Sequence, residues 1–191
     1  MRRQANASNR VFVSLFVVLL AGCAADDVFF EPNMDFGSVQ SVAVLPFQNL
    51  TNVDEAAERV RDTFMDMLLA TGALYVLPPG EVARGISKLS RFPHEGPSLE
   101  QIKQLSTILE VDAIFTGVVR EYGTVRSCTA SANVVSVSVQ MFETTNALVV
   151  WSASSTKGGI GLRDRLFGGG GAPMNTVTVK AVDDLLDKLF D

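Results

Sequence analysis

Two short apolar segments joined by a helix limit most strongly the folds open to this chain. Residues 41–47 (SVAVLPF) are apolar at successive positions, as in a strand buried on both faces. Residues 54–70 carry apolar side chains at helical spacing and end before Gly72, and residues 73–78 form a second short apolar segment. The order strand, helix, strand predicts two parallel strands joined by a right-handed helical crossover.

The rest of the chain adds strands and helices around this unit. Residues 132–143 alternate valine or methionine with serine or glutamine, which predicts a half-exposed antiparallel strand. Further strands are predicted at 111–125 and 148–155, and further helices at 80–90, 98–109 and 175–190. The pairs Asn52 with Glu55 and Ser98 with Gln101 predict capping boxes at two helix starts. The order β-α-β-α-α-β-β-β-α predicts an α/β domain over residues 41–191, with a mixed sheet of about five strands flanked by about four helices.

The N-terminal region has the features of a bacterial lipoprotein signal. A start with three arginines and no acidic residue precedes an apolar run at residues 11–20, which is too short for a permanent membrane span. Small residues and a cysteine then follow, in the cleavage motif Leu20, Ala21, Gly22 and Cys23. Residues 1–22 are therefore predicted to be a signal peptide, and Cys23 the lipidated N-terminus of the mature chain.

The residues after Cys23 predict where the protein is anchored. In the enterobacterial sorting rule an aspartate directly after the cysteine retains a lipoprotein in the inner membrane, and here Ala24 and Ala25 follow. We therefore expect a lipid anchor in the outer membrane with the domain on the periplasmic face, held stably by several acyl chains. Residues 23–40 are predicted to be the lipidated cysteine and a short tether, although Phe29, Phe30 and Phe36 are unusual for a free linker.

Charge excludes one class of partner. The full chain has a net charge of −5, and loss of the three arginines in residues 1–22 makes the mature chain −8. Because phosphate backbones repel so acidic a domain, we expect no nucleic-acid binding.

Residue types that carry catalysis or bind metals are sparse. His94 is the only histidine, and after lipidation of Cys23 the only free thiol is Cys128, so a zinc site lacks its ligands. No local sequence signature supports a nucleophile pair of Cys128 with His94. Asp183, Asp184 and Asp187 fall opposite the apolar stripe of the last helix and are predicted to form a solvated face. We predict a non-enzymatic protein with no cofactor, no bound metal and no small-molecule substrate.

A glycine-rich stretch at residues 157–173 leaves two interpretations open. It lacks the Gly-Lys-Ser/Thr ending of a phosphate-binding loop, so it is either a surface loop without a function or a binding loop for a protein or the membrane surface. On the second interpretation the contacts come from Arg163, Arg165, Leu166 and Phe167.

Four motifs in order behind the lipoprotein signal carry a family resemblance. They are VAVLPFQNLT (42–51), DAIFTGVVREYG (112–123), VVWSASSTKGG (149–159) and APMNTVTVKAVDDLL (172–186). With them the chain resembles the lipoprotein family of the curli secretion channel (CsgG-like), to which activator lipoproteins of penicillin-binding proteins (LpoB-like) and the N-terminal domain of TolB are related. The resemblance implies an accessory or adaptor role in envelope assembly or secretion, with envelope proteins and copies of itself as partners, and adds Gln48 and Asn49 of the Pro-Phe-x-Asn turn as candidate contacts.

The chain departs from this family at two places. The channel-forming member carries two long membrane-spanning hairpins, whereas the corresponding segments here, between Tyr122 and Val134 and between Lys157 and Pro173, are too short and lack the alternating pattern. We therefore expect no pore of its own. An activator of a penicillin-binding protein in peptidoglycan synthesis is the alternative function, although the short tether disfavours a role that requires reach across the cell wall.

Overall fold

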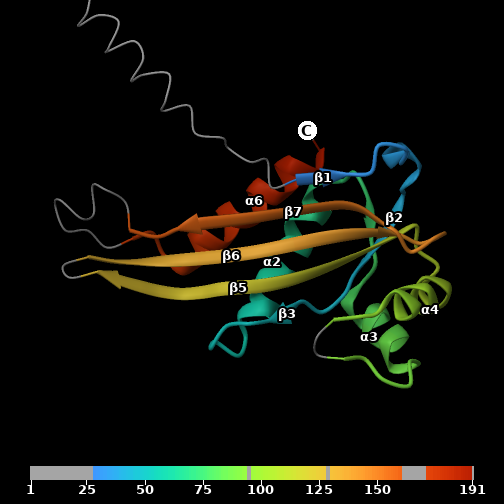
Figure 1. Ribbon diagram of the computed structural model, residues 1–191, viewed down its shortest axis with the longest axis horizontal. Coiled ribbons are helices and arrows are strands. Elements are labelled where there is room, and N and C mark those ends of the chain that lie inside the picture. Colours follow the sequence, from blue (N-terminus) through green and yellow to red (C-terminus); the bar gives the residue numbers. More distant parts are fainter. Residues whose placement is uncertain (1–27, 94–95, 128–129, 161–170, 191) are drawn as a thin grey trace, which may run out of the picture.

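A long antiparallel hairpin dominates the sheet of this computed structural model, which describes residues 28–93, 96–127, 130–160 and 171–190. The strands are β1 (Val28–Phe30), β2 (Ser41–Val44), β3 (Gln48–Asn49), β4 (Tyr75–Val76), β5 (Ala113–Ser127), β6 (Ala130–Glu143) and β7 (Val149–Gly158). They form one seven-stranded sheet in the order β1-β7-β6-β5-β2-β4, and β3 pairs with β5 beside this path (Figure 1). The predicted α/β class with a mixed sheet is confirmed, and the sheet gains β1 and β3.

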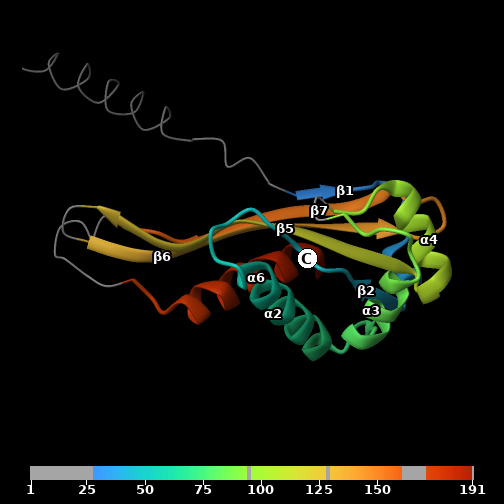
Figure 2. The same cartoon turned by 90° about the horizontal axis from the view of Figure 1, so that it is seen from below.

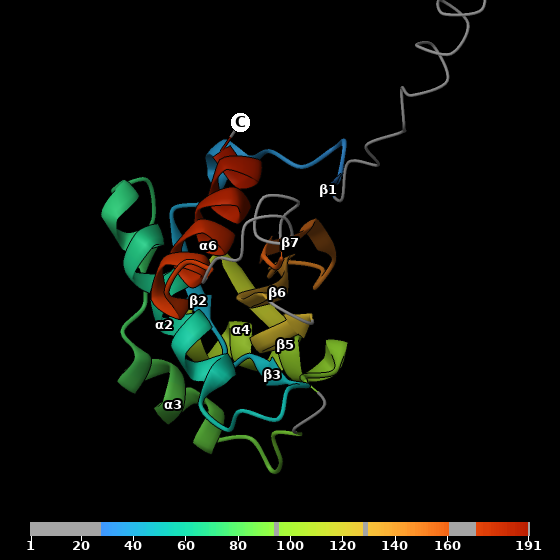
Figure 3. The same cartoon turned by 90° about the vertical axis from the view of Figure 1, so that its left-hand side faces the viewer.

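The helices lie on both faces of the sheet but cover them unequally. They are α2 (Ala56–Thr71), α3 (Pro79–Ser87), α4 (Leu99–Leu109) and α6 (Met174–Phe190), with a short 3-10 helix, η1, at Phe36–Ser38. Figure 2 shows α2 and α6 along one face, whereas α3 and α4 lie at one end of the molecule. The view along the strands in Figure 3 shows α6 and α2 next to each other on one side of the sheet, to the left of β5, β6 and β7, and the two helices also contact each other.

The predicted strand–helix–strand unit is confirmed. β2 pairs in parallel with β4 and, on its other side, with β5. α2 ends where Gly72 adopts a left-handed conformation with φ of 64°. The capping box of Ser98 and Gln101 is also confirmed at the start of α4. The prediction of a capping box between Asn52 and Glu55 was wrong, because α2 begins only at Ala56 and its N-cap residue Glu55 makes no side-chain capping bond.

Two apolar cores lie on opposite faces of the sheet. The larger one packs α2 and α6 against the strands, and the alternating residues Val135, Val137 and Val139 of β6 point into it as predicted. The smaller one lies under α3 and α4 and includes Leu45, Ile102, Leu105 and Phe142. Outside the smaller core, the second face of β6 and β7 carries the half-buried serines Ser136, Ser138, Ser152 and Ser154.

The residues expected to form the tether differ most from the sequence prediction. β1 pairs antiparallel with β7, Met34 and Phe36 pack against the larger core, and Val39 is buried in it. Residues 28–39, which the sequence prediction placed in the tether, therefore pack against the domain. A strand of three residues is too short to show a periodicity, so the aromatic side chains were the only signal in the sequence.

Asp112 fixes the start of β2. One oxygen of its carboxylate accepts hydrogen bonds from the backbone N–H groups of Gln40 (3.0 Å) and Ser41 (2.8 Å) and from the hydroxyl of Ser41 (2.8 Å). These hydrogen bonds stabilise the ionised form and lower the pKa of Asp112. The first strand of the crossover is thus held to the loop before β5.

Candidate protein-interaction surface

The turn after β3 is shaped by one asparagine side chain. The amide of Asn49 donates hydrogen bonds to the carbonyl oxygens of Val53 (2.8 Å) and Asp54 (3.1 Å). Its carbonyl oxygen accepts from the backbone N–H (3.0 Å) and the hydroxyl (2.8 Å) of Thr51. Asn49 therefore closes the loop that leads into α2 and replaces the predicted capping box at Asn52. The side chain of Asn49 thus positions residues 50–53 of the loop, which are available for contact with a partner.

A groove runs between this loop and the outer part of β5. We call it the distal groove and define it by the loop 50–53 and residues 120–125 of β5; its volume is about 430 Å³. It exists because β5 continues well past β3, which pairs with it only at Val118 and Val119. A β-bulge after Val119 shifts the register with β6, and the guanidinium of Arg120 donates to the hydroxyl of Ser138 across the strands at 2.7 Å.

Three apolar side chains that line the distal groove are exposed. Leu50 is 57% exposed, Val53 40% and Val125 39%. Apolar side chains gathered around a concave surface, with Arg120 beside them, are typical of protein-binding sites. The arrangement can bind a partner by apolar contact and by hydrogen bonds from Arg120.

The ends of the predicted binding loop lie at the tip of the β5–β6 hairpin. The N–H groups of Gly159 and Gly171 donate to the carbonyl oxygens of Asn133 (2.8 Å) and Ser131 (3.1 Å). The side-chain amide of Asn133 donates to the carbonyl of Ala172 at 2.9 Å. The loop 50–53 thus lies on the β5 side of this hairpin, and the ends of the predicted binding loop lie against β6 near its tip, at one end of the molecule (Figure 1).

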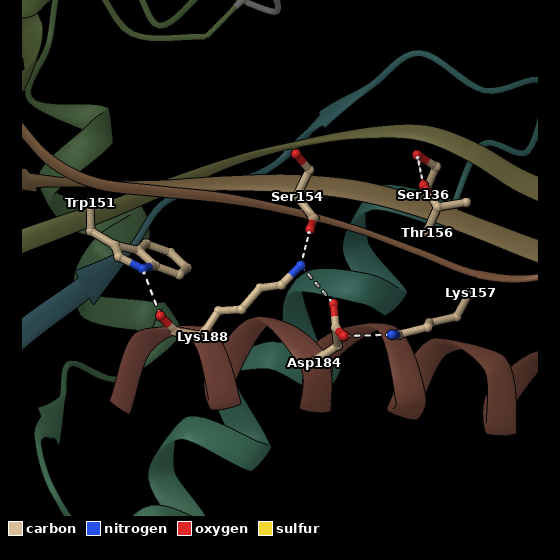
Figure 4. Close-up of polar contacts among 7 residues, drawn as sticks. All are labelled: Ser136, Trp151, Ser154, Thr156, Lys157, Asp184 and Lys188. Atoms are coloured by element: carbon tan, nitrogen blue, oxygen red, sulfur yellow. Dashed lines mark hydrogen bonds and ion pairs between the residues drawn. The ribbon is translucent and has the colours of Figure 1, made fainter. Parts of the chain in front are cut away.

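A charged network joins α6 to β7 beside this end. Asp184 forms ion pairs with Lys157 of β7 at 2.5 Å and with Lys188 of its own helix at 3.1 Å, and Lys188 also donates to the carbonyl of Ser154 at 2.8 Å (Figure 4). Burial would raise the pKa of Asp184, but the hydrogen bonds from the two lysines outweigh it and lower that pKa. The prediction that Asp184 belongs to a solvated face was wrong, because Lys157 reaches over it from the strand.

This network predicts a pH-dependent stability. Because the folded pKa of Asp184 is lowered, its stabilisation is complete above the ordinary aspartate pKa of about 3.9 and is lost as the pH falls through the folded value. We expect Asp184→Asn to lower the free energy of unfolding at pH 7 by about 1 kcal/mol, with a difference from wild type that narrows below about pH 4. Urea unfolding at a series of pH values measures both effects. Asp183→Asn, at an exposed neighbour, is the control, and an equal loss in both variants at every pH would contradict the prediction.

The residues predicted from the sequence fall into two groups, and two further residues of the site were missed. One group lies outside the described residues. It consists of the signal motif Leu20, Ala21 and Gly22, the lipidation residue Cys23, the loop residues Arg163, Arg165, Leu166 and Phe167, and the pair His94 and Cys128. Gln48 and Asn49 are half-buried in β3, next to the distal groove. Sequence reasoning missed the contribution of Arg120 and Val125, for which the signal was the length of β5 compared with the short strands beside it.

Among the described residues, no group of three or more histidine, cysteine, aspartate or glutamate side chains could hold a metal ion. Within the same part of the chain, no helix combines the length and the apolar character needed to cross a membrane.

Comparisons with known proteins find the same fold in solved structures of bacterial proteins. No protein-family model and no curated protein matches the sequence. A PelC dodecamer from Paraburkholderia phytofirmans matches with a TM-score of 0.56 and 16% identity, over 84% of this chain and 95% of that one. Lipoprotein GNA1162 from Neisseria meningitidis matches with a TM-score of 0.56 and 18% identity, over 78% of this chain and 97% of that one. These likenesses show a shared fold.

A third solved structure is less similar. The C-terminal domain of LpoB from Salmonella enterica matches with a TM-score of 0.47 and 11% identity, over 62% of this chain and 82% of that one. A similarity this low supports no argument about function, so the alternative rests on the family resemblance alone.

Proposed function

We propose that this chain is a lipid-anchored adaptor on the periplasmic face of the bacterial outer membrane, related to the CsgG-like lipoproteins, that acts by binding envelope proteins and copies of itself without catalysis. The observation that carries the proposal is the distal groove, whose rim exposes Leu50, Val53 and Val125. The lipoprotein signal ending at Cys23 supports the anchor. The fold is shared with a protein described as a lipoprotein and with one described as a dodecamer, which supports the anchor and self-association respectively.

A partner bound in the distal groove would bury apolar area that is otherwise exposed to water. A single exposed leucine or valine is ordinary on a protein surface. Three such side chains around one concave surface expose a larger apolar area to water, and a bound partner would bury it. Burial of apolar area contributes about 25 cal/mol per Å², and a hydrogen bond from Arg120 would add orientation. Side-chain hydrogen bonds of Asn49 hold the loop, and a backbone ladder holds the hairpin, so the groove is already formed before a partner arrives.

Photo-crosslinking in intact cells tests the proposal. A photoreactive phenylalanine derivative replaces Val125 in the full-length lipoprotein, and the control replaces Val179 of α6, a valine that is equally exposed at 39%. We expect discrete products only from position 125, and mass spectrometry identifies them as copies of this chain or as secretion and assembly proteins. Equal product yields from the two positions would contradict the groove as the binding site. A penicillin-binding protein as the main product would replace the adaptor function with the activator function.

A further inference from the structure

Two adjacent phenylalanines on β1 are exposed at the edge of the sheet. Phe29 is 46% exposed and Phe30 42%. In the pairing with β7, Phe29 lies opposite Ser152 and Phe30 opposite Trp151. Because successive side chains of a strand point to opposite faces, the two rings lie on either side of the sheet edge. An apolar pair of this size on an edge strand is unusual without something to cover it.

The fold holds the backbone of β1 and the ring of Phe30 in place. The N–H of Glu31 donates to the carbonyl of Val150 at 2.8 Å, which continues the ladder between β1 and β7. The ring of Phe30 packs edge-on against Phe36 with centroids 5.7 Å apart, and Phe36 in turn packs on the larger core. The domain therefore fixes both residues at the sheet edge through the backbone, and the ring of Phe30 through Phe36.

The chain length before β1 decides what covers them. Val28 follows Cys23 by five residues, and a fully extended chain spans at most about 3.6 Å per residue, so the Cα atoms of the two residues are at most about 18 Å apart. If Cys23 carries the lipid, as the proposed function holds, the start of β1 stays within about 18 Å of the lipidated residue at the bilayer surface. A lipid surface is then the apolar phase nearest to both phenylalanines at all times.

We infer that Phe29 and Phe30 insert into the interfacial region of the bilayer and form a second membrane contact beside the lipid anchor. Aromatic rings are favoured at the depth of the lipid headgroups. Asp26 and Asp27 precede the pair and Glu31 follows it, so the surface that fits is zwitterionic rather than anionic. The contact turns the β1 edge of the sheet toward the membrane and the opposite edge, β4, away from it.

The tryptophan content of the chain allows a direct test. Trp151 is the only tryptophan and is fully buried, so wild type gives a constant background. The full-length lipoprotein carrying Phe29→Trp is reconstituted in phosphatidylcholine vesicles with and without bromine on the acyl chains. We expect brominated lipid to reduce the added tryptophan emission by about half, because an interfacial ring reaches the upper acyl chain. Phe30→Trp is the second variant, which is used if circular dichroism shows that Phe29→Trp alters the fold.

Tyr75→Trp provides the matched control. Tyr75 is an aromatic residue on the opposite edge strand and is 59% exposed, so its replacement should show no quenching by brominated lipid. Mass spectrometry of the N-terminal peptide shows separately whether Cys23 is lipidated. Lipidated protein without quenching at positions 29 and 30 overturns the inference and leaves the anchor intact, whereas unlipidated protein overturns the proposed anchor itself. A blue-shifted emission without quenching would show instead that a second copy covers β1.

Discussion

Replacement of Trp151 by alanine is expected to lower the free energy of unfolding by about 3–5 kcal/mol, the range for a large aromatic residue removed from a core. Trp151 is fully buried between β7 and α6. Its ring packs edge-on against Phe115, with centroids 6.2 Å apart, and Phe115 packs in the same way against Phe64 of α2 at 5.4 Å. Loss of the indole therefore leaves a cavity between the strands and both helices of the larger core.

The indole also has a polar role, which a second variant isolates. Its Nε1–H donates to the carbonyl oxygen of Lys188 at 3.1 Å (Figure 4). This carbonyl lies in the last turn of α6, where backbone oxygens have no partner within the helix. Trp151→Phe keeps an aromatic ring and loses this bond, so we expect a smaller cost of about 1–2 kcal/mol. Urea unfolding followed by far-UV circular dichroism gives both values. A cost for Trp151→Ala no larger than that for Trp151→Phe would contradict the packing argument.

Strands and helices with a repeating apolar pattern were predicted well from the sequence, and short strands that depend on a single pairing in the folded chain were not. Val135, Val137 and Val139 repeat with a period of two, and their common burial followed from that pattern. β1 and β3 have three and two residues, and they exist because neighbouring strands offer free hydrogen-bonding groups. No local pattern encodes such pairing, which depends on the position of β5 and β7 in the folded chain.

The same limit applies to the candidate site. Gln48 and Asn49 were identified from a motif, and they lie next to the distal groove. Arg120 and Val125 complete it from a strand more than sixty residues later in the sequence, and only the folded sheet brings the two segments together. Asp184 shows the same effect, because its neighbours along the helix predict a solvated carboxylate and its partner Lys157 comes from β7.

Two adjacent glycines at the end of β7 should respond very differently to alanine. Gly158 and Gly159 have φ of +90° and +87°, values that side chains with a Cβ disfavour. A Cβ on Gly159 would meet no atom within 4 Å, so Gly159→Ala is expected to cost only the backbone strain, about 1–2 kcal/mol. Gly159 is therefore the control for the conformational part of the effect.

Gly158→Ala adds a steric clash that the backbone cannot avoid. Its Cβ would lie 2.0 Å from the carbonyl oxygen of Asn133 and 2.9 Å from a methyl group of Val177 on α6. That carbonyl accepts the N–H of Gly159, so the strand must move and the hydrogen bond at the hairpin tip must break. We expect Gly158→Ala to cost at least about 3 kcal/mol, roughly twice the cost of Gly159→Ala.

Hydrogen exchange shows where the damage occurs. In Gly158→Ala we expect faster exchange at residues 131–134 of β6 and in the first turns of α6, and unchanged exchange in α3 and α4 around the smaller core. This pattern follows because Asn133 joins β6 both to Gly159 and, through its side chain, to Ala172. Equal stability of the two alanine variants would show that the tip adjusts without cost. In that case the position of the distal groove would not depend on the close contact between Gly158 and Asn133.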